Sequence, residues 1–592
     1  MGLWESSLAL PSLGNVYTDL LSFAFNGPVC YDKQQPLFID AEDPSRSLNA
    51  IQTRLLIRTL IAGLKAHDVC SGDCVLVHLG NNIIYPALFF SIVGAGGVYM
   101  GTNPRSQPHE LDHILGLADP KLIITSHDAL PTVLNASAGR GMSPSQVCLL
   151  DEFAIDHLMQ FLLLGPFVYS AANFTLPLYS GPESYINFAH LLLYGQDDWI
   201  TFNDEAIAKA TRAAMFPTSG TGGLPKAAYL SHHAIISQHL SINYTVPYKV
   251  TRMMSLPMFH LFGALWTHIF PARYGHPLFI LPRFEVTQFL AAVHQYQITE
   301  TYMVPAMIHT LNRSSLPVAE FFGSLRYVGV AGAPIDRPSM QHFQGMLHAH
   351  AEASQLWGMT ETGVAFQTRY GEQGDAASIG RLMPGYEAYI VGADGSAILS
   401  DNCPGELYVR GPGLLTGYKG RDDALDRHGW FQTGDIAYVS NGLYYIVGRT
   451  KELIKVRGWQ VPPAELEAVL LKHHAIEDAA VTGVTLRDGT TEVPRAFIVR
   501  SKSPSANRLT PEEVYSFARS QLASYKALDG GVVFVEEIPR TASGKIQRFK
   551  LSQMNTYREM VASLLTQFQG GKDEPAESVS PVGVLQEGRV TV

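Results

Sequence analysis

Residues 218–226 of this 592-residue chain read Thr218-Ser219-Gly220-Thr221-Gly222-Gly223-Leu224-Pro225-Lys226. Small residues let backbone N–H groups turn inward and form a nest for phosphate oxygens, and the hydroxyl groups and the lysine add donors and positive charge. The loop differs from the usual P-loop because Pro225 precedes the lysine and Ala227 follows it. It also contains no dinucleotide-binding G-x-G-x-x-G pattern. We therefore predict a phosphate-binding loop of another kind.

A second Gly-Lys loop and five further segments follow this loop in a fixed order. The segments are Val330-Ala331-Gly332-Ala333-Pro334, Gln355-Leu356-Trp357-Gly358-Met359-Thr360-Glu361-Thr362-Gly363, Trp430-Phe431-Gln432-Thr433-Gly434-Asp435, Gly448-Arg449-Thr450-Lys451-Glu452-Leu453-Ile454-Lys455, Gly458-Trp459-Gln460-Val461-Pro462-Pro463-Ala464-Glu465-Leu466-Glu467 and the second loop, Pro539-Arg540-Thr541-Ala542-Ser543-Gly544-Lys545. So many short segments in one order are very improbable by chance.

This order resembles the adenylate-forming (ANL) superfamily, which includes acyl-CoA synthetases, 4-coumarate:CoA ligases, beetle luciferases and peptide-synthetase adenylation domains. The resemblance covers about residues 45–560 and replaces a length-based guess at the number of domains. It implies an α/β fold: a large N-terminal adenylate-forming domain, with αβαβα-type subdomains and a small β-barrel, and a smaller α+β C-terminal lid domain.

The apolar pattern agrees with this division. Buried strands are predicted at 74–79 and 121–125, with a helix over 85–94, as in a layered α/β body. After Gly448 the pattern changes to a small α+β unit, with a helix from Pro463 to Lys472, strands near 479–481 and 496–499, and a capped helix that starts at Thr510-Pro511-Glu512-Glu513. We predict an AMP-binding domain at 1–450, a mobile C-terminal domain at 451–569 and a flexible tail at 570–592.

Composition excludes several classes of protein. The formal net charge is −10 and no Lys/Arg stripe is present, which argues against a nucleic-acid partner. Apolar residues make up 46% of the chain, so disorder over most of its length is not expected. Five scattered cysteines without C-x-x-C spacing fit a reducing compartment, and no transition-metal site is predicted.

Targeting and membrane signals are weak. The N-terminus carries Glu5 and no basic region before an apolar stretch, and the chain lacks a C-terminal S-K-L tripeptide, so we predict a cytoplasmic enzyme. An apolar stretch at 158–174 is interrupted by Gly165-Pro166 and is shorter than the roughly 20 residues that a bilayer requires. We interpret it as an insert, either a lineage-specific insertion or translated intron sequence, and predict no integral membrane span.

The predicted chemistry begins with a poor electrophile. A carboxylate needs a better leaving group before a thiol can attack it, and attack on the α-phosphate of ATP provides AMP. Because anions repel, catalysis requires Mg²⁺, phosphate-cradling amides and a lysine near the transition state. The predicted cofactors and co-substrates are therefore ATP, Mg²⁺ and CoA, and the predicted substrate is a carboxylic acid.

The resemblance assigns roles to individual residues in the nucleotide site. It implies that residues 218–226 bind the pyrophosphate portion, that Thr360 contacts phosphate, and that Glu361 coordinates Mg²⁺, a hard cation that prefers oxygen. Lys545 would bridge the substrate carboxylate and the α-phosphate. The remaining nucleotide-binding residues are implied to be Asp435 and Arg449 at the ribose, Gly332, Ala333 and Pro334 beside adenine, and Trp357 and Gly358 in the neighbouring segment.

The resemblance also implies a second use of the same site, for thioester formation. The C-terminal domain would rotate about a hinge at Lys451, withdraw Lys545 and present the loop of Lys455 and Gln460 to the adenylate and the CoA thiol. His260 matches a histidine at the wall between the acyl pocket and the thiol tunnel. A satisfied core histidine is the competing interpretation of His260.

Four positions depart from the family pattern. Gly222 stands where Thr or Ser is common, and Ala227 stands where Gly is common, which removes a phosphate donor, alters the expected mobility of the loop and predicts a weaker activity. Leu356 replaces a frequent glycine, and Trp266 adds bulk shortly after His260. These two residues predict an acyl pocket that is shorter or differently angled than in coumarate ligases.

Our prediction is an ATP-dependent acid:CoA ligase of peripheral or secondary metabolism, acting on an aromatic or medium-chain acid. Two alternatives remain open: a stand-alone acyl-AMP ligase that loads a separate carrier protein, and a catalytically silent adenylate-binding protein. Taken alone, Glu361, Asp435 and Lys545 could each be an ordinary solvated or turn residue. Their occurrence together in the ordered segments favours the enzyme.

Overall fold

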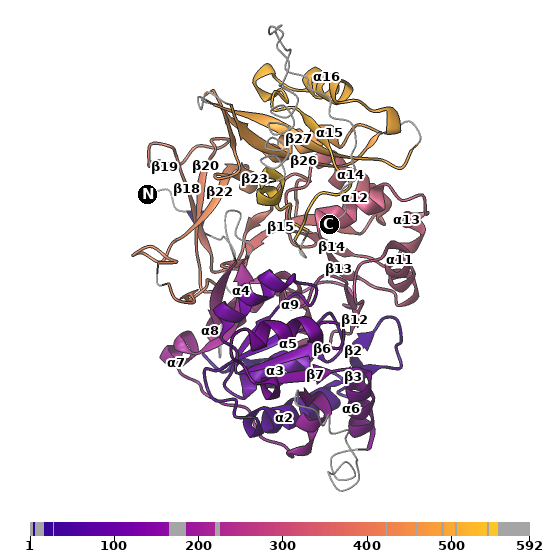
Figure 1. The fold of residues 1–592 in the computed structure, drawn as a ribbon, viewed down its shortest axis with the longest axis vertical. Coiled ribbons are helices and arrows are strands. Elements are labelled where there is room, and N and C mark those ends of the chain that lie inside the picture. Colours follow the sequence, from indigo (N-terminus) through magenta and orange to yellow (C-terminus); the bar gives the residue numbers. More distant parts are fainter. Residues whose placement is uncertain are drawn as a thin grey trace, which may run out of the picture. The chain divides into compact units, whose positions relative to one another are not determined.

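The computed structural model describes residues 4–5, 17–27, 29–164, 185–218, 225–421, 423–457, 459–486, 491–503, 506–541 and 544–553. The chain divides into two compact units (Figure 1). The first comprises Met1–Thr433 with Tyr438–Tyr445, and the second comprises Gly434–Ala437 with Ile446–Val592. The boundaries between the two units therefore lie within two strands that follow each other in the sequence. The domain limits at residues 450 and 569 stay predictions.

One sheet of the first unit contains eight strands in the order β21-β10-β9-β5-β4-β6-β7-β8. They are β21 (Gly417–Tyr418), β10 (Lys226–Ser231), β9 (Arg212–Thr218), β5 (Val98–Gly101), β4 (Cys74–His78), β6 (Leu122–Ser126), β7 (Val147–Leu150) and β8 (Ile186–Asn187). The run from β9 to β8 is parallel, and β10 and β21 are antiparallel to their neighbours. Every residue of β4 is buried, as expected of a strand covered on both faces.

A second sheet of the first unit contains nine strands in the order β17-β16-β15-β14-β13-β11-β12-β2-β3. They are β17 (Arg381–Leu382), β16 (Gly363–Gln367), β15 (Glu352–Met359), β14 (Tyr327–Val330), β13 (Glu300–Met303), β11 (Arg252–Met254), β12 (Leu278–Ile280), β2 (Pro36–Asp40) and β3 (Ser47–Asn49). The central run from β15 to β2 is parallel. The carboxyl ends of these strands therefore meet at one edge.

Helices connect and cover the strands of both sheets. In Figure 1, α2, α3 and α5 lie around β6 and β7. Leu111 and Leu115 from α4 and Val133 from α5 pack with Leu76 and Ile123 in the core of the first sheet. The helices of the first unit are α1 (Leu20–Phe25), α2 (Ala50–Ala66), α3 (Tyr85–Gly94), α4 (Pro108–Ala118), α5 (Leu130–Ala138), α6 (Glu152–Leu164), α7 (Glu205–Ala210), α8 (His232–Ile242), α9 (Leu261–Thr267), α10 (Ile269–Tyr274), α11 (Val286–Gln295), α12 (Pro305–Asn312), α13 (Val318–Phe321) and α14 (Arg337–Met346), with 3-10 helices η1 (Pro144–Gln146) and η2 (Phe188–Leu193).

A third sheet is formed mainly by strands between residues 387 and 449. Its order is β1-β18-β20-β22-β23, and β19 pairs with β18. The strands are β1 (Trp4–Glu5), β18 (Glu387–Val391), β19 (Ala397–Ile398), β20 (Gly405–Arg410), β22 (Phe431–Ser440) and β23 (Leu443–Arg449). Burial alternates along β20 and β22, which is typical of strands with one covered face. The chain passes between the two units twice within β22 and once within β23.

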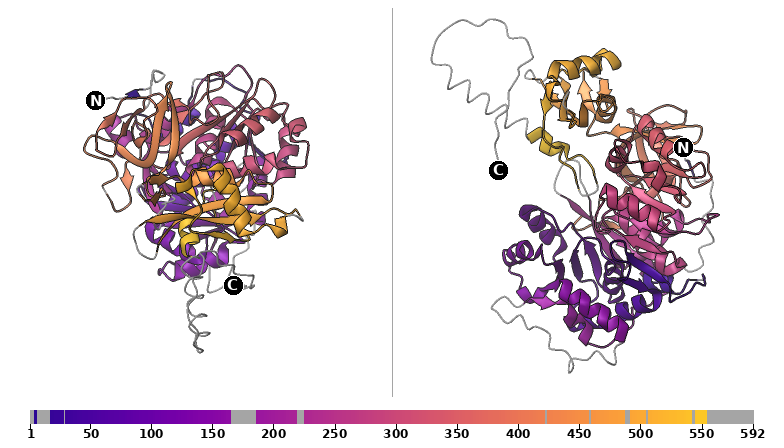
Figure 2. Two further views of the ribbon diagram at one scale, coloured as in Figure 1. Left: turned by 90° about the horizontal axis from the view of Figure 1, so that it is seen from above. Right: turned by 90° about the vertical axis from the view of Figure 1, so that its right-hand side faces the viewer.

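The second unit is a small α+β structure. Figure 2 shows its helices, in orange and yellow, on one small sheet. Its elements are β24 (Ile454–Val456), β25 (Trp459–Val461), α15 (Pro463–Leu470), β26 (Ile476–Thr485), β27 (Glu492–Arg500), η3 (Ala506–Arg508), α16 (Pro511–Gln521), η4 (Ser524–Lys526) and β28 (Val532–Phe534). Leu466, Val481, Ile498 and Val514 share its core. The predicted capping box is confirmed, because Thr510 and Glu513 exchange side chain-to-backbone hydrogen bonds of 3.2 and 2.9 Å.

The apolar stretch at 158–174 begins inside α6, which ends at Leu164. Leu163 and Leu164 are exposed at the end of this helix. Residues 165–174 lie outside the described residues. No helix in the described part of the chain combines the length and the apolarity needed to cross a bilayer.

Candidate active site

The carboxyl edge of the second sheet collects most of the predicted residues of the first unit. His260 follows β11, Gly332–Pro334 follow β14, and Thr360 and Glu361 follow β15. Because β11, β13, β14 and β15 are parallel neighbours, loops that are distant in sequence begin at one edge. In open α/β sheets, ligands bind at this edge.

The turn that carries Thr360 and Glu361 is tightly built. It joins β15 to β16, and the side chain of Thr362 accepts a hydrogen bond from Met359 N at 3.1 Å. Tyr386 donates to the carbonyl of Thr362 at 2.6 Å. A Cβ atom on Gly358 would lie 2.1 Å from the carbonyl oxygen of Gly363, so only glycine fits there. The turn therefore fixes two side chains, Thr360 and Glu361, that are 8% and 6% exposed.

Glu361 is linked to Lys226 through Tyr418. The Tyr418 hydroxyl donates to Oε1 of Glu361 at 2.9 Å, and Nζ of Lys226 lies 4.6 Å from the centre of the Tyr418 ring. Burial raises the pKa of Tyr418, and the nearby Glu361 carboxylate raises this pKa further. Tyr418 therefore acts as a hydrogen-bond donor. None of the sequence motifs includes Tyr418, although it stands in β21 beside the first residues of β10.

The donor set at Glu361 fits a magnesium ion that is completed by nucleotide phosphates. Oε1 is occupied by Tyr418, whereas Oε2 has no hydrogen-bond partner among the described residues. Those residues contain no cluster of three or more His, Cys, Asp or Glu side chains that could enclose a metal. Mg²⁺ is commonly bound by one or two carboxylates together with substrate phosphates and water, so a single carboxylate is sufficient here.

The predicted phosphate loop lies between β9 and β10. Thr218 is the last residue of β9 and is 5% exposed, and the exposed Lys226 is the first residue of β10. Ser219, Gly220, Thr221, Gly222 and Gly223 lie outside the described residues. At the end of the loop, His113 of α4 donates from Nε2 to the carbonyl of Pro225 at 2.8 Å. Ala227 is buried in β10, where its carbonyl accepts from Lys419 N.

The segment predicted to lie beside adenine follows β14. Gly332 has φ +99°, a conformation that L residues rarely adopt, and Ala333 is half-buried while Pro334 is exposed. Trp357 on β15 is buried and packs edge-on against Phe366, with ring centres 5.5 Å apart. Gly332–Pro334 thus form a surface loop next to the turn of Thr360.

His260 is held by the loop that precedes α9. It is the N-cap of α9, where its Nδ1 accepts from Phe262 N at 3.3 Å. Asn81 fixes this loop by donating to the carbonyl of Leu256 at 2.9 Å and accepting from Met258 N at 2.8 Å. His260 is half-buried.

An aromatic stack begins on α9, the helix that His260 caps. Trp266, on α9, is 1% exposed, and its ring lies nearly parallel to the ring of Tyr302, with centres 3.9 Å apart. It also stacks on Phe270 at 5.7 Å. Tyr302 stands near the carboxyl end of β13. Phe270 in turn lies over the guanidinium group of Arg252, the first residue of β11, at 4.1 Å, so the stack extends toward the amino edge of the sheet.

The second unit brings the two predicted ribose-binding residues together. Asp435 is 3% exposed, and one of its carboxylate oxygens lies 2.9 Å from Nε of Arg449. Thr450 N donates to the carbonyl of Gly434 at 2.8 Å and keeps the two segments adjacent. The exposed Lys451 follows directly.

The second unit also places Lys455 opposite Gln460. They are paired across the antiparallel strands β24 and β25, so their side chains emerge on one face. Both are exposed. Lys545 lies in a separate loop, in which Thr541 N donates to the carbonyl of Lys545 at 2.8 Å and Lys545 N donates to Thr541 Oγ1 at 3.1 Å.

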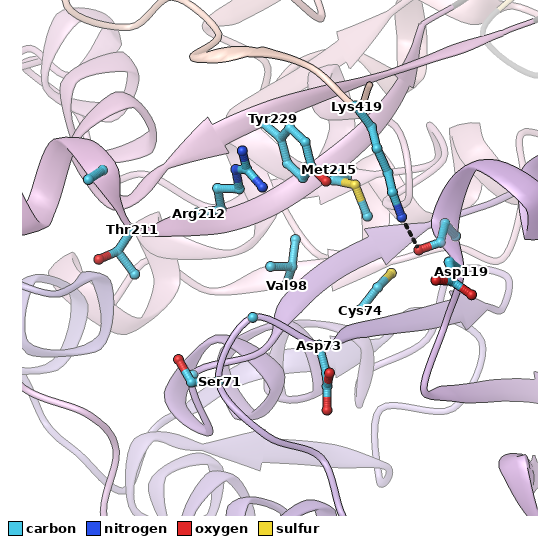
Figure 3. Close-up of a pocket in the computed structure, with 14 residues that line it drawn as sticks. Ser71, Asp73, Cys74, Val98, Asp119, Thr211, Arg212, Met215, Tyr229 and Lys419 are labelled. Atoms are coloured by element: carbon cyan, nitrogen blue, oxygen red, sulfur yellow. Dashed lines mark hydrogen bonds between the residues drawn. The ribbon is translucent and has the colours of Figure 1, made fainter. Parts of the chain in front are cut away.

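A cavity of about 440 Å³ lies at the amino edge of the first sheet, where its parallel strands begin (Figure 3). Cys74, Val98 and Arg212, which line it, are the first residues of β4, β5 and β9. Figure 3 shows Lys419 reaching across it, where its ammonium group donates to the carbonyl of Ala118 at 2.9 Å. None of the predicted site residues lines this cavity.

Known proteins resemble both units of the chain. The family model described as AMP-binding enzyme matches residues 32–419, and that of the AMP-binding enzyme C-terminal domain matches residues 465–545. Nicotinic acid-CoA ligase olcI of Penicillium canescens is 52% identical over 93% of this chain and 100% of its own. Nicotinic acid-CoA ligase pyr1 of Aspergillus fumigatus is 51% identical over 93% and 98%. The solved structure of ATP-bound MatB from Rhodopseudomonas palustris shares the fold, with a TM-score of 0.74 and 22% identity over 91% of this chain and 99% of that one.

The chain belongs to the AMP-binding enzyme family, within the adenylate-forming superfamily. Full-length relatives at about half identity are acid:CoA ligases, and this chain is likewise an ATP-dependent, AMP-forming acid:CoA ligase. The predicted family, fold class and reaction are therefore confirmed.

Proposed function

We propose that the acid substrate is a small single-ring aromatic acid of the pyridine-carboxylate class, such as nicotinic acid. The similarity to two nicotinic acid-CoA ligases over nearly the whole length of each chain carries this proposal. The bulk of buried Trp266, on the helix that His260 caps, agrees with a small acid.

We further propose the residue roles that the resemblance implies. Residues 218–226 and Thr360 bind phosphate groups, and Asp435 with Arg449 binds ribose. Glu361 holds Mg²⁺, which supplies charge neutralisation at the phosphates when bound. Lys545 neutralises the carboxylate and α-phosphate during adenylate formation, whereas Lys455 and Gln460 serve thioester formation. The use of Lys451 as a hinge belongs to the same proposal.

Acid-dependent pyrophosphate release tests the substrate. Nicotinate, benzoate, 4-coumarate and octanoate would be compared with saturating MgATP, with and without CoA. Nicotinate should give a kcat/KM roughly tenfold or more above the others, the scale on which a shaped pocket discriminates one or two groups. Faster turnover of 4-coumarate or octanoate would refute the assignment to a small pyridine-carboxylate acid. Release without thioester would instead favour loading of a separate carrier protein, and nucleotide binding without release would favour a silent binder.

The two lysines of the second unit provide a test of the divided roles. Lys545→Ala should lower adenylate formation by about 100-fold or more, because a charge aimed at the transition state is lost, while thioester formation from a supplied acyl-adenylate is spared. Lys455→Ala should show the reverse pattern. Single-turnover assays of each half-reaction measure both, and Lys472→Ala, on the surface of the same unit, serves as a control. Equal losses in the two half-reactions would contradict the division.

A further inference from the structure

Tyr418 contacts two groups of opposite charge in different ways. Its hydroxyl donates to Oε1 of Glu361 at 2.9 Å, and its ring face receives the ammonium group of Lys226 at 4.6 Å. A hydrogen bond to a carboxylate and a cation over an aromatic face are both favourable, and neither requires the two charges to touch.

The backbone around Tyr418 is fixed from both sides. In β21, Tyr418 pairs with Ala228 of β10. Leu415 N donates to the carbonyl of Glu361 at 2.8 Å, and Lys419 N donates to the carbonyl of Ala227 at 2.9 Å. Segment 415–419 therefore joins the strand that begins at Lys226 to the turn that carries Glu361.

The side chain of Lys419 adds an anchor at the far edge of the sheet. Its ammonium group donates to the carbonyl of Ala118, at the end of α4 (Figure 3). Neighbouring residues on one strand point to opposite faces. Lys419 and Tyr418 thus secure the strand in different directions, so the Tyr418 ring has little freedom to move away from Glu361.

The arrangement keeps two attracting charges apart. An ammonium group and a buried carboxylate in one region would pair directly if nothing intervened. Among the described residues, Lys226 and Glu361 form no ion pair with each other, and Oε2 of Glu361 has no hydrogen-bond partner. A direct pair would neutralise both groups and leave neither available for phosphate or a metal ion.

We propose that Tyr418 is a positioning residue that separates Lys226 from Glu361 and orients both toward the nucleotide. The hydroxyl occupies one oxygen of Glu361 and leaves the other for Mg²⁺, while the ring holds the ammonium group beside the phosphate loop. This inference rests on the roles proposed above for Lys226 and Glu361.

Two substitutions separate the two contacts. Tyr418→Phe keeps the ring and removes the hydroxyl, whereas Tyr418→Leu removes both. Tyr229→Phe, on the adjacent strand and at the cavity of the opposite edge, makes the same chemical change as a control. The readouts are the Mg²⁺ concentration for half-maximal pyrophosphate release, and calorimetric binding of the non-hydrolysable analogue AMPCPP at several Mg²⁺ concentrations.

Tyr418→Phe should raise the half-saturating Mg²⁺ concentration about tenfold in both assays, the scale of one hydrogen bond to a charged group, while Tyr229→Phe matches the parent enzyme. Tyr418→Leu should also weaken AMPCPP binding, because Lys226 then pairs with Glu361. Adding Lys226→Met to Tyr418→Leu should partly restore the Mg²⁺ dependence, since the competing ammonium group is gone. If the side chain of Tyr418 were merely structural, adding Lys226→Met would not restore the Mg²⁺ dependence.

Unchanged Mg²⁺ dependence in Tyr418→Phe would overturn the inference. A double variant that is no better than Tyr418→Leu would overturn the separating role. Glu361→Gln, measured in parallel, distinguishes the levels of failure: if it too leaves the Mg²⁺ dependence unchanged, the proposed role of Glu361 fails. Thermal unfolding and circular dichroism identify any variant that does not fold, and Tyr418→Phe, which loses a single oxygen atom, keeps the test decisive if Tyr418→Leu is one of them.

Discussion

Two buried glutamates at opposite edges of the second sheet have opposite surroundings. Glu300, the first residue of β13, is 4% exposed, and its two oxygens accept from Tyr248 at 3.1 Å and from Arg252 Nε at 2.8 Å. Glu361, beyond the carboxyl end of β15, is 6% exposed and uses one oxygen, for Tyr418. Burial is therefore the same at both positions, and the number of satisfied acceptor sites differs. A buried acid whose partners all belong to the protein stabilises the fold, whereas one with an unused oxygen is available to a ligand.

Glu300 and its partner Arg252 both have further contacts within the protein. Arg252 also approaches Nδ1 of His276 at 3.0 Å and lies over the ring of Phe270 at 4.1 Å. Burial alone would lower the pKa of Arg252, but Glu300 and its neighbours outweigh that effect and raise this pKa. Arg252 and Glu300 begin adjacent parallel strands, so their pairing aligns the amino edge.

The largest expected effect is the loss of stability in Glu300→Gln. Removing one charge leaves Arg252 buried and uncompensated, which costs about 3–5 kcal/mol in the free energy of unfolding. Urea unfolding of the first unit, followed by tryptophan fluorescence, measures this loss. The kcat of the molecules that remain folded should be unchanged. Glu42→Gln, an exposed position in the same unit, is the matched control. A loss of activity without a loss of stability would break the comparison.

The reciprocal substitution, Glu361→Gln, should mainly affect catalysis. The amide keeps an acceptor for Tyr418 and removes the charge offered to the nucleotide site. We expect kcat/KM for ATP to fall about 100- to 1000-fold, equivalent to about 3–4 kcal/mol, with the free energy of unfolding changed by less than about 1 kcal/mol. Steady-state kinetics and urea unfolding of the same preparation measure both. A stability loss as large as that of Glu300→Gln would show that Glu361 is structural.

The sequence predicted local elements and ordered motifs well because both depend on neighbouring residues. Strands at 74–79 and 121–125 correspond to β4 and β6, and the predicted helix over 85–94 coincides with α3. The helix predicted from Pro463 ends at Leu470, two residues before the predicted end at Lys472, with Leu471 as its C-cap. Helix ends fray, so the last helical residue is defined only to within one or two positions.

The sequence could not predict contacts between residues that are distant along the chain. Tyr418 stands 57 positions from Glu361. The residues around Tyr418 give no indication that its partner is Glu361. Arg252 and Glu300 are 48 positions apart and meet only because β11 and β13 are neighbours. Strand order decides these pairs, and periodicity within a segment carries no information about strand order. The sequence therefore does not distinguish Glu300, whose two carboxylate oxygens both accept hydrogen bonds, from Glu361, which uses only one.

Trp266 is intermediate between the two glutamates and gives the smallest expected effect. Its ring faces are covered by Tyr302 and Phe270, but its buried Nε1 has no hydrogen-bond partner in the described part of the chain. Trp266→Phe preserves a ring over Tyr302 and removes volume on the helix that His260 caps. The ratio of kcat/KM for 4-coumarate to that for nicotinate should rise roughly tenfold, because the discrimination available from a change of this size is about 1–3 kcal/mol.

The matched control for Trp266 is Trp430→Phe. Trp430 is 8% exposed and packs against Tyr389 of the third sheet. The substitution Trp430→Phe therefore removes the same volume in another part of the chain. Pyrophosphate release with the two acids gives the ratio for each variant. If both variants lose stability and neither changes the ratio, Trp266 belongs with Glu300 as a structural residue, and the short acyl pocket needs another wall. If the ratio changes only in Trp266→Phe, Trp266 takes part in selecting the acid, as proposed above.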